Sequence, residues 1–536
     1  MTVLGLATDD FVVLAAAPLL IWAQIFWFDQ VEQHVPEPYL DEVFHIPQAN
    51  AFWQGNWSQW DDKITTPPGL YIYSIAAAKL FGFGFQEQDE LSPYQLRLTN
   101  LVLISLLILA CATWRRCTDA EMYRSTGVAV QDLCITSFPL IFFFSALYYT
   151  DLFSAFTVMS TYAIWQAGLN KRGTKKLIYQ LLHVLAGVVS LTSRQTNIFW
   201  SAVFLGGLQV IYTIKHNTRV HDPPVADAYF EDIPIMAISL ITSALNMIPQ
   251  LVAELWPHLT LLGTFASFVV WNGGVVLGDK SNHTAGLHVP QMLYLWPFMM
   301  FFSWPVLLPQ LAHASQLQRR LPRALLVLIV VLGMLVVVHL NTVVHPFLLA
   351  DNRHYTFYVF KILRLYPWLW YAMTPIYALC AWLSIQALGS RLSYSGGPGV
   401  KDSRTRRLST ASGLGDLEMK EVDTNRSSFV LVWALSTALS LVSAPLVEPR
   451  YLLIPWLIWR LHIPHPTHVL KDTAQSGSGI HESDSAIERL LTTIAKRSLL
   501  IELVWYGLIN YITCRLFLYK GFNWPQEPGK TQRFMW

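Results

Sequence analysis

Charged residues are scarce in this sequence. Asp, Glu, Lys and Arg make up only 13% of its 536 residues, whereas hydrophobic residues make up 53%. An ordinary soluble domain carries about twice that share of charge. Runs such as 101–112, 135–146 and 324–340 contain none of these four residue types, and with their apolar flanks they approach the roughly 20 residues that cross a bilayer. We therefore predict an all-α, polytopic membrane protein of about 12–14 transmembrane helices.

Other familiar features are also missing. A net charge of +2 argues against the concentrated basic face of a nucleic-acid-binding protein. The five cysteines form no Cys-x-x-Cys pair, which argues against a disulfide framework and a zinc site. There is no Walker A motif, no Gly-x-Gly-x-x-Gly and no His-Glu-x-x-His, and Asp61 and Asp62 are adjacent rather than spaced. We therefore expect no metal and no cofactor, and a donor that is neither ATP nor a nucleotide sugar.

The basic loops predict the topology, because loops rich in Lys and Arg tend to stay in the cytosol. Six such groups follow apolar runs in an alternating pattern, at 115–124, 171–176, 215–219, 319–323, 401–407 and 496–497. Spans are then expected near 11–28, 98–114, 131–148, 152–170, 177–192, 198–214, 258–277, 291–311, 324–343, 364–388, 429–446, 451–463 and 498–519, while 70–85 and 233–256 are either spans or interfacial helices. The first run lacks a basic leader and an evident cleavage site, so we expect an uncleaved first helix.

This topology gives one transmembrane domain over residues 1–536 with three long polar connections. The first lumenal loop is 29–97, a cytosolic polar insert is 390–428, and a further cytosolic polar loop is 465–488. The two cytosolic segments are rich in Ser and Gly and carry no catalytic pattern. The first loop, in contrast, holds two pairs of adjacent acids, Asp41-Glu42 and Asp61-Asp62, among several Trp residues. Such acids at a membrane edge either bind something polar or are simply solvated on an amphipathic loop.

Four more polar clusters fall on the same side of the predicted membrane. They are 193–197 around Arg194, 278–283 around Lys280, 345–355 around Arg353, and 448–451 around Arg450. Each has an ordinary structural explanation: a snorkelling arginine, a hydrophilic turn, or a local ion pair. Together they offer cations, amides and imidazoles that can bracket a phosphate and sugar hydroxyls. Their shared side favours a binding or catalytic site.

These clusters resemble the signature blocks of one known family. The matching segments are Asp41–Ala49, Ile64–Tyr71, Arg194–Asn197, Gly278–His283, Asp351–Tyr358 and Glu448–Tyr451, with Gln532–Trp536 at the C-terminal end. They look like those of the dolichyl-phosphate-glucose α-1,2-glucosyltransferases of the endoplasmic reticulum. The resemblance implies a GT-C type membrane glycosyltransferase of the endoplasmic reticulum membrane with a lumenal active site. It further implies two lipid-bound partners, dolichyl-phosphate glucose as donor and the diglucosylated lipid-linked oligosaccharide as acceptor.

The resemblance also suggests roles for the clustered residues. The donor is β-linked and the product α-linked, so the reaction inverts the anomeric carbon and needs a base for the acceptor hydroxyl. We expect Asp41 to be that base, with Glu42 as the next candidate. Adjacent side chains point in different directions, so the two should not share the role. Asp61 and Asp62 are weaker alternatives that could instead position the acceptor. For the donor phosphate the candidates are Arg194, Lys280, His283, Arg353, His354 and Arg450. For sugar and acceptor contacts they are His45, Asp61, Asp62, Gln195, Asn197, Asp279, Asn282, Asp351, Asn352 and Glu448.

Two other functions are compatible with a membrane protein of this kind. A GT-C enzyme of another family would use the same lipid-phosphate chemistry on a different acceptor, but the blocks 65–69 and 278–283 argue against it. A transporter would show repeated halves and ionisable residues near mid-bilayer. No half-to-half similarity is evident, and the polar clusters lie at the ends of the predicted spans.

Overall fold

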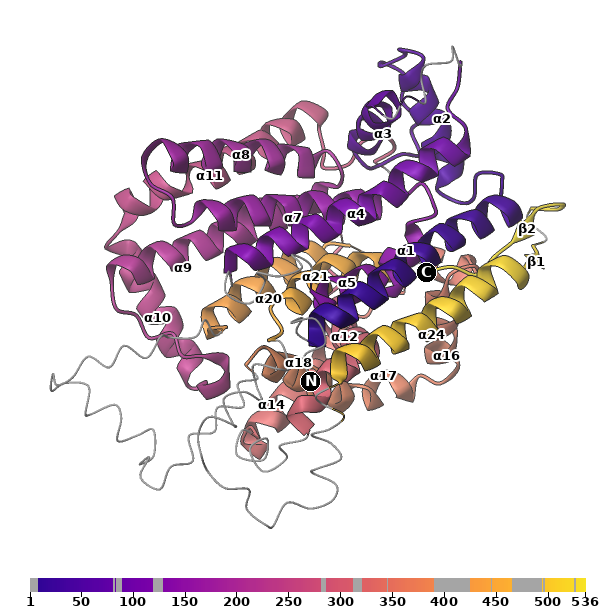
Figure 1. The fold of residues 1–536 in the computed structure, drawn as a ribbon. Coiled ribbons are helices and arrows are strands. Elements are labelled where there is room, and N and C mark those ends of the chain that lie inside the picture. Colours follow the sequence, from indigo (N-terminus) through magenta and orange to yellow (C-terminus); the bar gives the residue numbers. More distant parts are fainter. Residues whose placement is uncertain are drawn as a thin grey trace, which may run out of the picture.

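A computed structural model describes residues 8–80, 89–118, 129–280, 286–311, 321–344, 346–389, 425–444, 446–464, 497–524 and 527–536, together with Gly82 and Ile494. Within these ranges the chain is almost entirely helical (Figure 1). The candidates Asn282 and His283 lie outside the described residues, as do most of the insert 390–428 and the whole loop 465–488.

The helices of the N-terminal half are α1 (Thr8–His34), α2 (Glu42–Trp53), α3 (Gly69–Leu80), α4 (Pro93–Thr118), α5 (Val130–Ser137), α6 (Pro139–Phe144), α7 (Thr150–Gly168), α8 (Gly173–Leu191), η1 (Gln195–Asn197), the π-helix η2 (Phe199–Phe204), α9 (Leu205–Asn217), η3 (Val225–Asp227), α10 (Asp232–Leu245) and α11 (Ile248–Asn272). Those of the C-terminal half are α12 (Gln291–Leu311), α14 (Ala324–Asn341), α15 (Pro346–Ala350), α16 (Tyr355–Leu365), α17 (Trp368–Ala372), α18 (Thr374–Leu388), α20 (Ser427–Leu441), η4 (Pro449–Leu452), α21 (Leu453–Leu461) and α24 (Ser498–Tyr519). The described strands, β1 (Phe522–Asn523) and β2 (Thr531–Gln532), form one short antiparallel hairpin.

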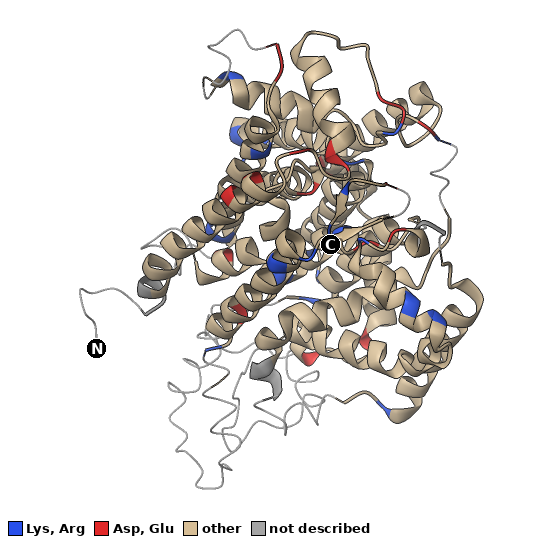
Figure 2. Cartoon of the chain, turned by 90° about the vertical axis from the view of Figure 1, so that its right-hand side faces the viewer, with Lys and Arg blue, Asp and Glu red and all other residues tan. Residues whose placement is uncertain are grey.

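The predicted all-α membrane fold is confirmed. Six described segments are long and apolar enough to cross a bilayer, or seven if α10 and α11, which meet at 96°, count as one broken span. They are Val12–His34, Pro93–Thr118, Gln195–Asn217, Ala324–Asn341, Trp368–Leu388 and Ser498–Tyr519. Most of the ribbon in Figure 2 is tan, as the low share of charge requires.

Two of the expected spans do not form single long helices, and their apolar residues are buried in protein. The span expected at 131–148 is divided into α5 and α6 by Pro139, and every residue of both short helices is buried. The span expected at 451–463 contains only the 9-residue helix α21, which is also buried throughout. The ring of Phe138 stacks on Trp456 with 3.6 Å between centroids, so the two segments pack on one another. An apolar run alone does not distinguish contact with lipid from contact with protein.

The helices of the first loop are too short to span a bilayer. Helices α2 and α3 have 12 residues each, about 18 Å at 1.5 Å per residue. They lie together at the upper right of Figure 1, above the end of α1, beside which the hairpin β1–β2 lies. Arg533, just after β2, links the ends of α24 and α1. Its guanidinium donates to the carbonyls of Phe517 and Leu518 in α24 and of His34 in α1. One cation thereby satisfies carbonyls in the last turns of two membrane helices.

Candidate active site

The two acids at the start of α2 have different environments. Glu42 is completely buried, and its carboxylate accepts hydrogen bonds from Arg97 at 2.6 and 2.9 Å. It also accepts from the backbone N–H groups of Tyr39, at 3.0 Å, and Tyr148, at 2.7 Å. Four donors leave this carboxylate no capacity for a substrate proton, so Glu42 fixes the start of α2.

Asp41 is accessible where Glu42 is not. Its side chain is 44% exposed, and one carboxylate oxygen accepts a hydrogen bond from Arg450 at 2.9 Å. Its backbone N–H donates to the hydroxyl of Tyr149 at 3.2 Å. Burial acts to raise the pKa of the Asp41 carboxyl, but Arg450, together with His45 and His354, outweighs that effect, and the pKa is lowered from its usual value. Asp41 is therefore ionised at neutral pH.

Arg450 gathers three acids, two of them from distant parts of the chain. Besides Asp41, it binds Glu448 at 2.7 Å and lies 3.8 Å from Asp151, the second residue of α7. Burial acts to lower the pKa of the guanidinium, but the three acids and Tyr149 raise it well above its usual value. A second guanidinium, Arg194, reaches Asp151 from the other side at 2.9 Å. The cluster thus holds three carboxylates and two guanidiniums, and Asp41 is the most exposed of the acids. Oδ2 of Asp151 is buried without a hydrogen bond, and its nearest cation is Arg450.

His45 stands beside this cluster. It follows Asp41 by four residues and therefore shares its face of α2. Its Nδ1 is 2.6 Å from the hydroxyl of Tyr71. Burial, only partly offset by Asp41, lowers the pKa of His45 below its usual value, so the ring is neutral at pH 7.

The block around Arg353 contacts the C-terminal segment. Arg353 binds Asp351 with Nε and Nη2, at 2.6 to 3.0 Å, and donates from Nη1 to Gln532 at 3.0 Å. His354 pairs with Met535 in a backbone bridge, and its Nδ1 is 3.1 Å from the carbonyl of Trp536. All three nitrogens of the Arg353 guanidinium are thus already in use.

The C-terminal segment in turn reaches the loop that carries Asp41. The Tyr39 hydroxyl donates to the Arg533 carbonyl at 2.8 Å and accepts from the Arg533 N–H at 2.7 Å. Burial raises the pKa of Tyr39 to about 12, so it remains a hydrogen-bond donor. The electrostatic influence of His354 is felt at Asp41 itself, where it helps to lower the pKa. The Arg353 block and the Asp41 cluster are therefore neighbours.

The second half of the first loop contacts the Lys280 block. The backbone N–H of Asp279 donates to the Asp62 carbonyl at 2.7 Å. Gly278 has φ +66°, and a Cβ there would lie 2.3 Å from that same oxygen, so only glycine fits. Lys280 is exposed, and its ammonium donates to the carbonyl of Asn272. Among the cationic candidates that the structure describes, it is the one with no carboxylate partner.

The remaining candidates divide into accessible and structural groups. Asp62 is exposed, whereas Asp61 caps the adjacent turn by accepting from the Lys63 N–H at 2.9 Å. Gln195 donates its amide to the Thr65 carbonyl. Asn197 is fully buried between Ser154, Ser190 and Ser193 and holds the α8–η2 connection together. Asn352 keeps a buried side-chain oxygen without a partner among the described residues, which is an available acceptor.

Comparison with known proteins identifies the family. A model of the DIE2/ALG10 family matches residues 35–461, which include the whole Asp41–Arg450 cluster. The chain belongs to the DIE2/ALG10 family. Three similar relatives carry the name Dol-P-Glc:Glc(2)Man(9)GlcNAc(2)-PP-Dol alpha-1,2-glucosyltransferase. That of Emericella nidulans is 41% identical and the alignment covers 95% of this chain and 96% of the relative. That of Yarrowia lipolytica is 32% identical over 98% of both chains, and one from Homo sapiens 31% over 95% of both.

The solved structures add little. The apo crystal structure of ArnT from Cupriavidus metallidurans aligns over 95% of this chain and 91% of its own, with 13% identity and a TM-score of 0.33. So weak a likeness supports no conclusion about this DIE2/ALG10 member. Among its described residues no group of His, Cys, Asp and Glu could hold a metal ion.

Two residues of the candidate site belong to no polar cluster in the sequence. Asp151 is a single acid at the start of an apolar run, yet it lies between Arg194 and Arg450. Arg97 is a single cation at the end of the first loop, yet it is fully buried and binds Glu42, Glu32 and the carbonyls of Val35 and Glu37. An acid or arginine inside an apolar span was the one available sign.

Proposed function

We propose that this chain transfers glucose from dolichyl-phosphate glucose to the diglucosylated lipid-linked oligosaccharide, Glc2Man9GlcNAc2-PP-dolichol, and forms the terminal α-1,2 linkage. The family membership supports the substrates, because full-length relatives carry that name. The observation that carries the chemistry is the accessible, ionised Asp41 at the edge of a buried charge cluster. The endoplasmic reticulum membrane and a lumenal position of this site belong to the same proposal.

Asp41 is the proposed general base. Its free carboxylate oxygen takes the proton of the acceptor 2-hydroxyl as that oxygen attacks the anomeric carbon of the donor glucose. The bond between that carbon and the phosphate oxygen breaks, and its electron pair leaves with dolichyl phosphate. The attack comes from the face opposite the phosphate and therefore converts a β-linked donor into an α-linked product. Arg450 keeps Asp41 ionised and oriented before the reaction.

The departing phosphate needs cations more than it needs an acid. Lys280 is the first candidate, since its ammonium is exposed and binds only a backbone carbonyl among the described residues. Arg194 is the second, because its Nε and Nη2 bind Thr150 and Asp151 while its Nη1 makes no hydrogen bond to a described residue. Arg353 and Arg450 are positioning residues, since acids already occupy their guanidiniums. We assign the sugar contacts to Asp62, Gln195, Asp279 and Asn352, which lie near these cations.

The decisive experiment measures glucose transfer by purified protein from dolichyl-phosphate glucose to Glc2Man9GlcNAc2-PP-dolichol. Asp41→Asn keeps the size of the side chain and removes the base, so transfer should fall by about 10²-fold or more while the thermal unfolding temperature stays close to that of the parent. Glu37→Gln is the matched control, because Glu37 is an exposed acid four residues away in the same loop. Near-normal turnover by Asp41→Asn would remove Asp41 as the base. Transfer from a mannosyl donor but not from the glucosyl donor would overturn the substrate assignment.

A further inference from the structure

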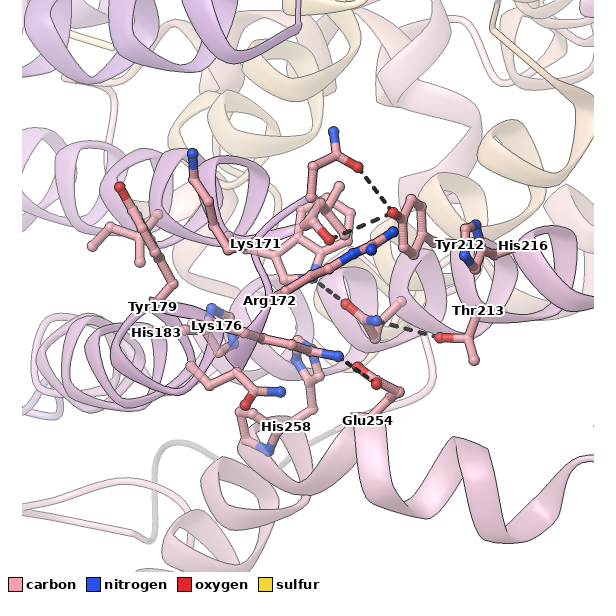
Figure 3. Close-up of a pocket in the computed structure, with 18 of the residues that line it drawn as sticks. Lys171, Arg172, Lys176, Tyr179, His183, Tyr212, Thr213, His216, Glu254 and His258 are labelled. Atoms are coloured by element: carbon pink, nitrogen blue, oxygen red, sulfur yellow. Dashed lines mark hydrogen bonds and ion pairs between the residues drawn. The ribbon is translucent and has the colours of Figure 1, made fainter. Parts of the chain in front are cut away.

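A polar cavity of about 340 Å³ lies between α7, α8, α9 and α11, away from the Asp41 cluster (Figure 3). Helix α7 begins beside the cluster, with Asp151, and reaches the cavity with Gly168. Helix α8 runs the other way, from the cavity to the connection that carries Arg194. Each has 19 residues, about 28 Å at 1.5 Å per residue. The cavity and the cluster are therefore at opposite ends of the same two helices.

The mouth of the cavity is cationic. Lys171 and Arg172 precede α8, and Lys176 lies in its first turn. Figure 3 shows these three side chains among the residues that line the cavity. Glu254 is the one carboxylate among the lining residues, and it pairs with Lys176. Three cations and one acid leave an excess of positive charge, to which the N-terminal end of α8 adds its free N–H groups and dipole.

The floor of the cavity holds two buried imidazoles. His183 of α8 and His258 of α11 are 2% and 3% exposed, with ring centroids 4.6 Å apart. The backbone of Thr161 lies within reach of the His183 ring and that of Ser201 within reach of the His258 ring, but neither nitrogen of His183, nor Nδ1 of His258, has a well-formed hydrogen bond. Buried polar groups are normally well satisfied, so these nitrogens keep capacity for a hydrogen-bonding ligand in the cavity. Gln180 lies between mouth and floor on the same helix.

The outer face of α8 is apolar, which brings lipid to the mouth. Leu177, Ile178, Leu181 and Leu185 are all exposed on this helix. Lys176 and His183 are seven residues apart, about 10 Å along the helix axis. A ligand entering from the bilayer surface could place an anionic group at the mouth and hydroxyl groups at the imidazoles.

We propose that this cavity binds a phosphate-bearing polyol, such as the headgroup of an inositol phospholipid. The phosphate lies against Lys171, Arg172 and the first turn of α8, and the hydroxyl groups lie against Gln180, His183 and His258. The basic loop assigns the mouth to the cytosolic leaflet. The proposal is independent of the glucose-transfer reaction and of the residues assigned to it.

The test uses the full chain in nanodiscs. Retention of phosphatidylinositol monophosphate from a phosphatidylcholine background is measured by native mass spectrometry. The double variant Lys171→Gln/Arg172→Gln should lower its affinity by about tenfold or more, because two charge-assisted contacts are lost. Lys175→Gln is the matched control, since Lys175 is an exposed lysine of the same first turn that does not line the cavity. Its affinity should stay within about twofold of the parent. Equal affinity for double variant and parent, or an equal loss in Lys175→Gln, would overturn the site.

A second variant tests the floor without touching the charges. Gln180→Leu should weaken binding of the water-soluble inositol phosphate headgroup but leave the binding of inorganic phosphate unchanged. Unchanged headgroup binding would contradict the assignment of the floor. Competition separates the two sources of the ligand: displacement of the lipid by inositol phosphate favours a soluble phosphate as ligand, and no displacement favours a headgroup held with its acyl chains. Both variants should unfold at the parent temperature.

Discussion

At the scale of single residues, a neighbouring cation sets the protonation of Asp41. An ordinary Asp carboxyl binds its proton at about pH 4. Because the pKa of Asp41 is lowered, it binds its proton only at a lower pH than that. A base must be ionised to accept a proton, so titration of Asp41 should cause no fall in kcat/KM between about pH 5 and 8. Arg450→Gln removes the stabilising cation, the pKa of Asp41 rises, and the acid limb of the profile should move to higher pH. An unchanged limb in the kcat/KM–pH profile of Arg450→Gln would show that Asp41 does not control it.

Glu42 differs from Asp41 because it is buried together with its ion-pair partner, Arg97. Glu42→Gln leaves the Arg97 guanidinium buried without its carboxylate, and losing one member of such a pair typically costs about 3–5 kcal/mol. We therefore expect a lower unfolding temperature and a lower folded yield, measured by fluorescence-detected chromatography after heating. Glu37→Gln, on the exposed part of the loop, should change neither. Stability equal to the parent would mean that Glu42 is not a structural anchor.

The sequence located these residues and its resemblance to a family placed Asp41 before Glu42, but nothing in it showed that Glu42 is buried and Asp41 accessible. Polar clusters beside apolar runs stand out because burying charge in a membrane is costly, and so the blocks at 41, 194, 278, 351 and 448 were recognisable. Which of Asp41 and Glu42 turns inward depends on Arg97 and on the backbone N–H of Tyr148, both distant in sequence. Asp151 is not predicted as a site residue, because a single acid at the start of α7 belongs to no polar cluster in the sequence.

At the scale of elements, the C-terminal segment holds two parts of the site in place. Residues 532–536 contact Tyr39, two residues before Asp41, and also Arg353 and His354. Deleting residues 532–536 should leave the helices inserted but lower turnover by about tenfold or more, since small displacements of reacting groups are costly. Tyr39→Phe, which removes only the link to Arg533, should give a milder loss. Activity assays beside a protease-resistance profile would separate this effect from unfolding, and full turnover by the deletion would refute the positioning role.

The elements also mark where pattern reading fails. The apolar segments at α5, α6 and α21 look like spans in the sequence but form buried short helices, in which Phe138 and Trp456 stack. These segments are hydrophobic because they pack in the protein interior. Composition alone does not distinguish a protein interior from the lipid of a bilayer. The long, uniformly apolar run 324–341 is predicted correctly as a span, because Ala324–Asn341 is a single exposed helix.

At the scale of the whole molecule, the arrangement separates two polar regions by the length of α7 and α8. The basic residues before α8 predict that the cavity end faces the cytosol, and the Asp41 end then faces the lumen. Native Cys117, exposed at the end of α4 beside Arg116, reports on the end that is predicted to be cytosolic. In sealed microsomes a membrane-impermeant maleimide should label it without permeabilisation.

The opposite end is tested with an introduced cysteine. Gln59 is exposed in the first loop, near α2, and Gln59→Cys in a Cys117→Ser background should react only after the membrane is permeabilised. The other native cysteines are buried or half-buried in helices, so the signal comes from the introduced thiol. If both positions react in sealed microsomes, the two ends share one face of the membrane. The lumenal site and the cytosolic cavity would then be excluded together, because the same two helices fix both.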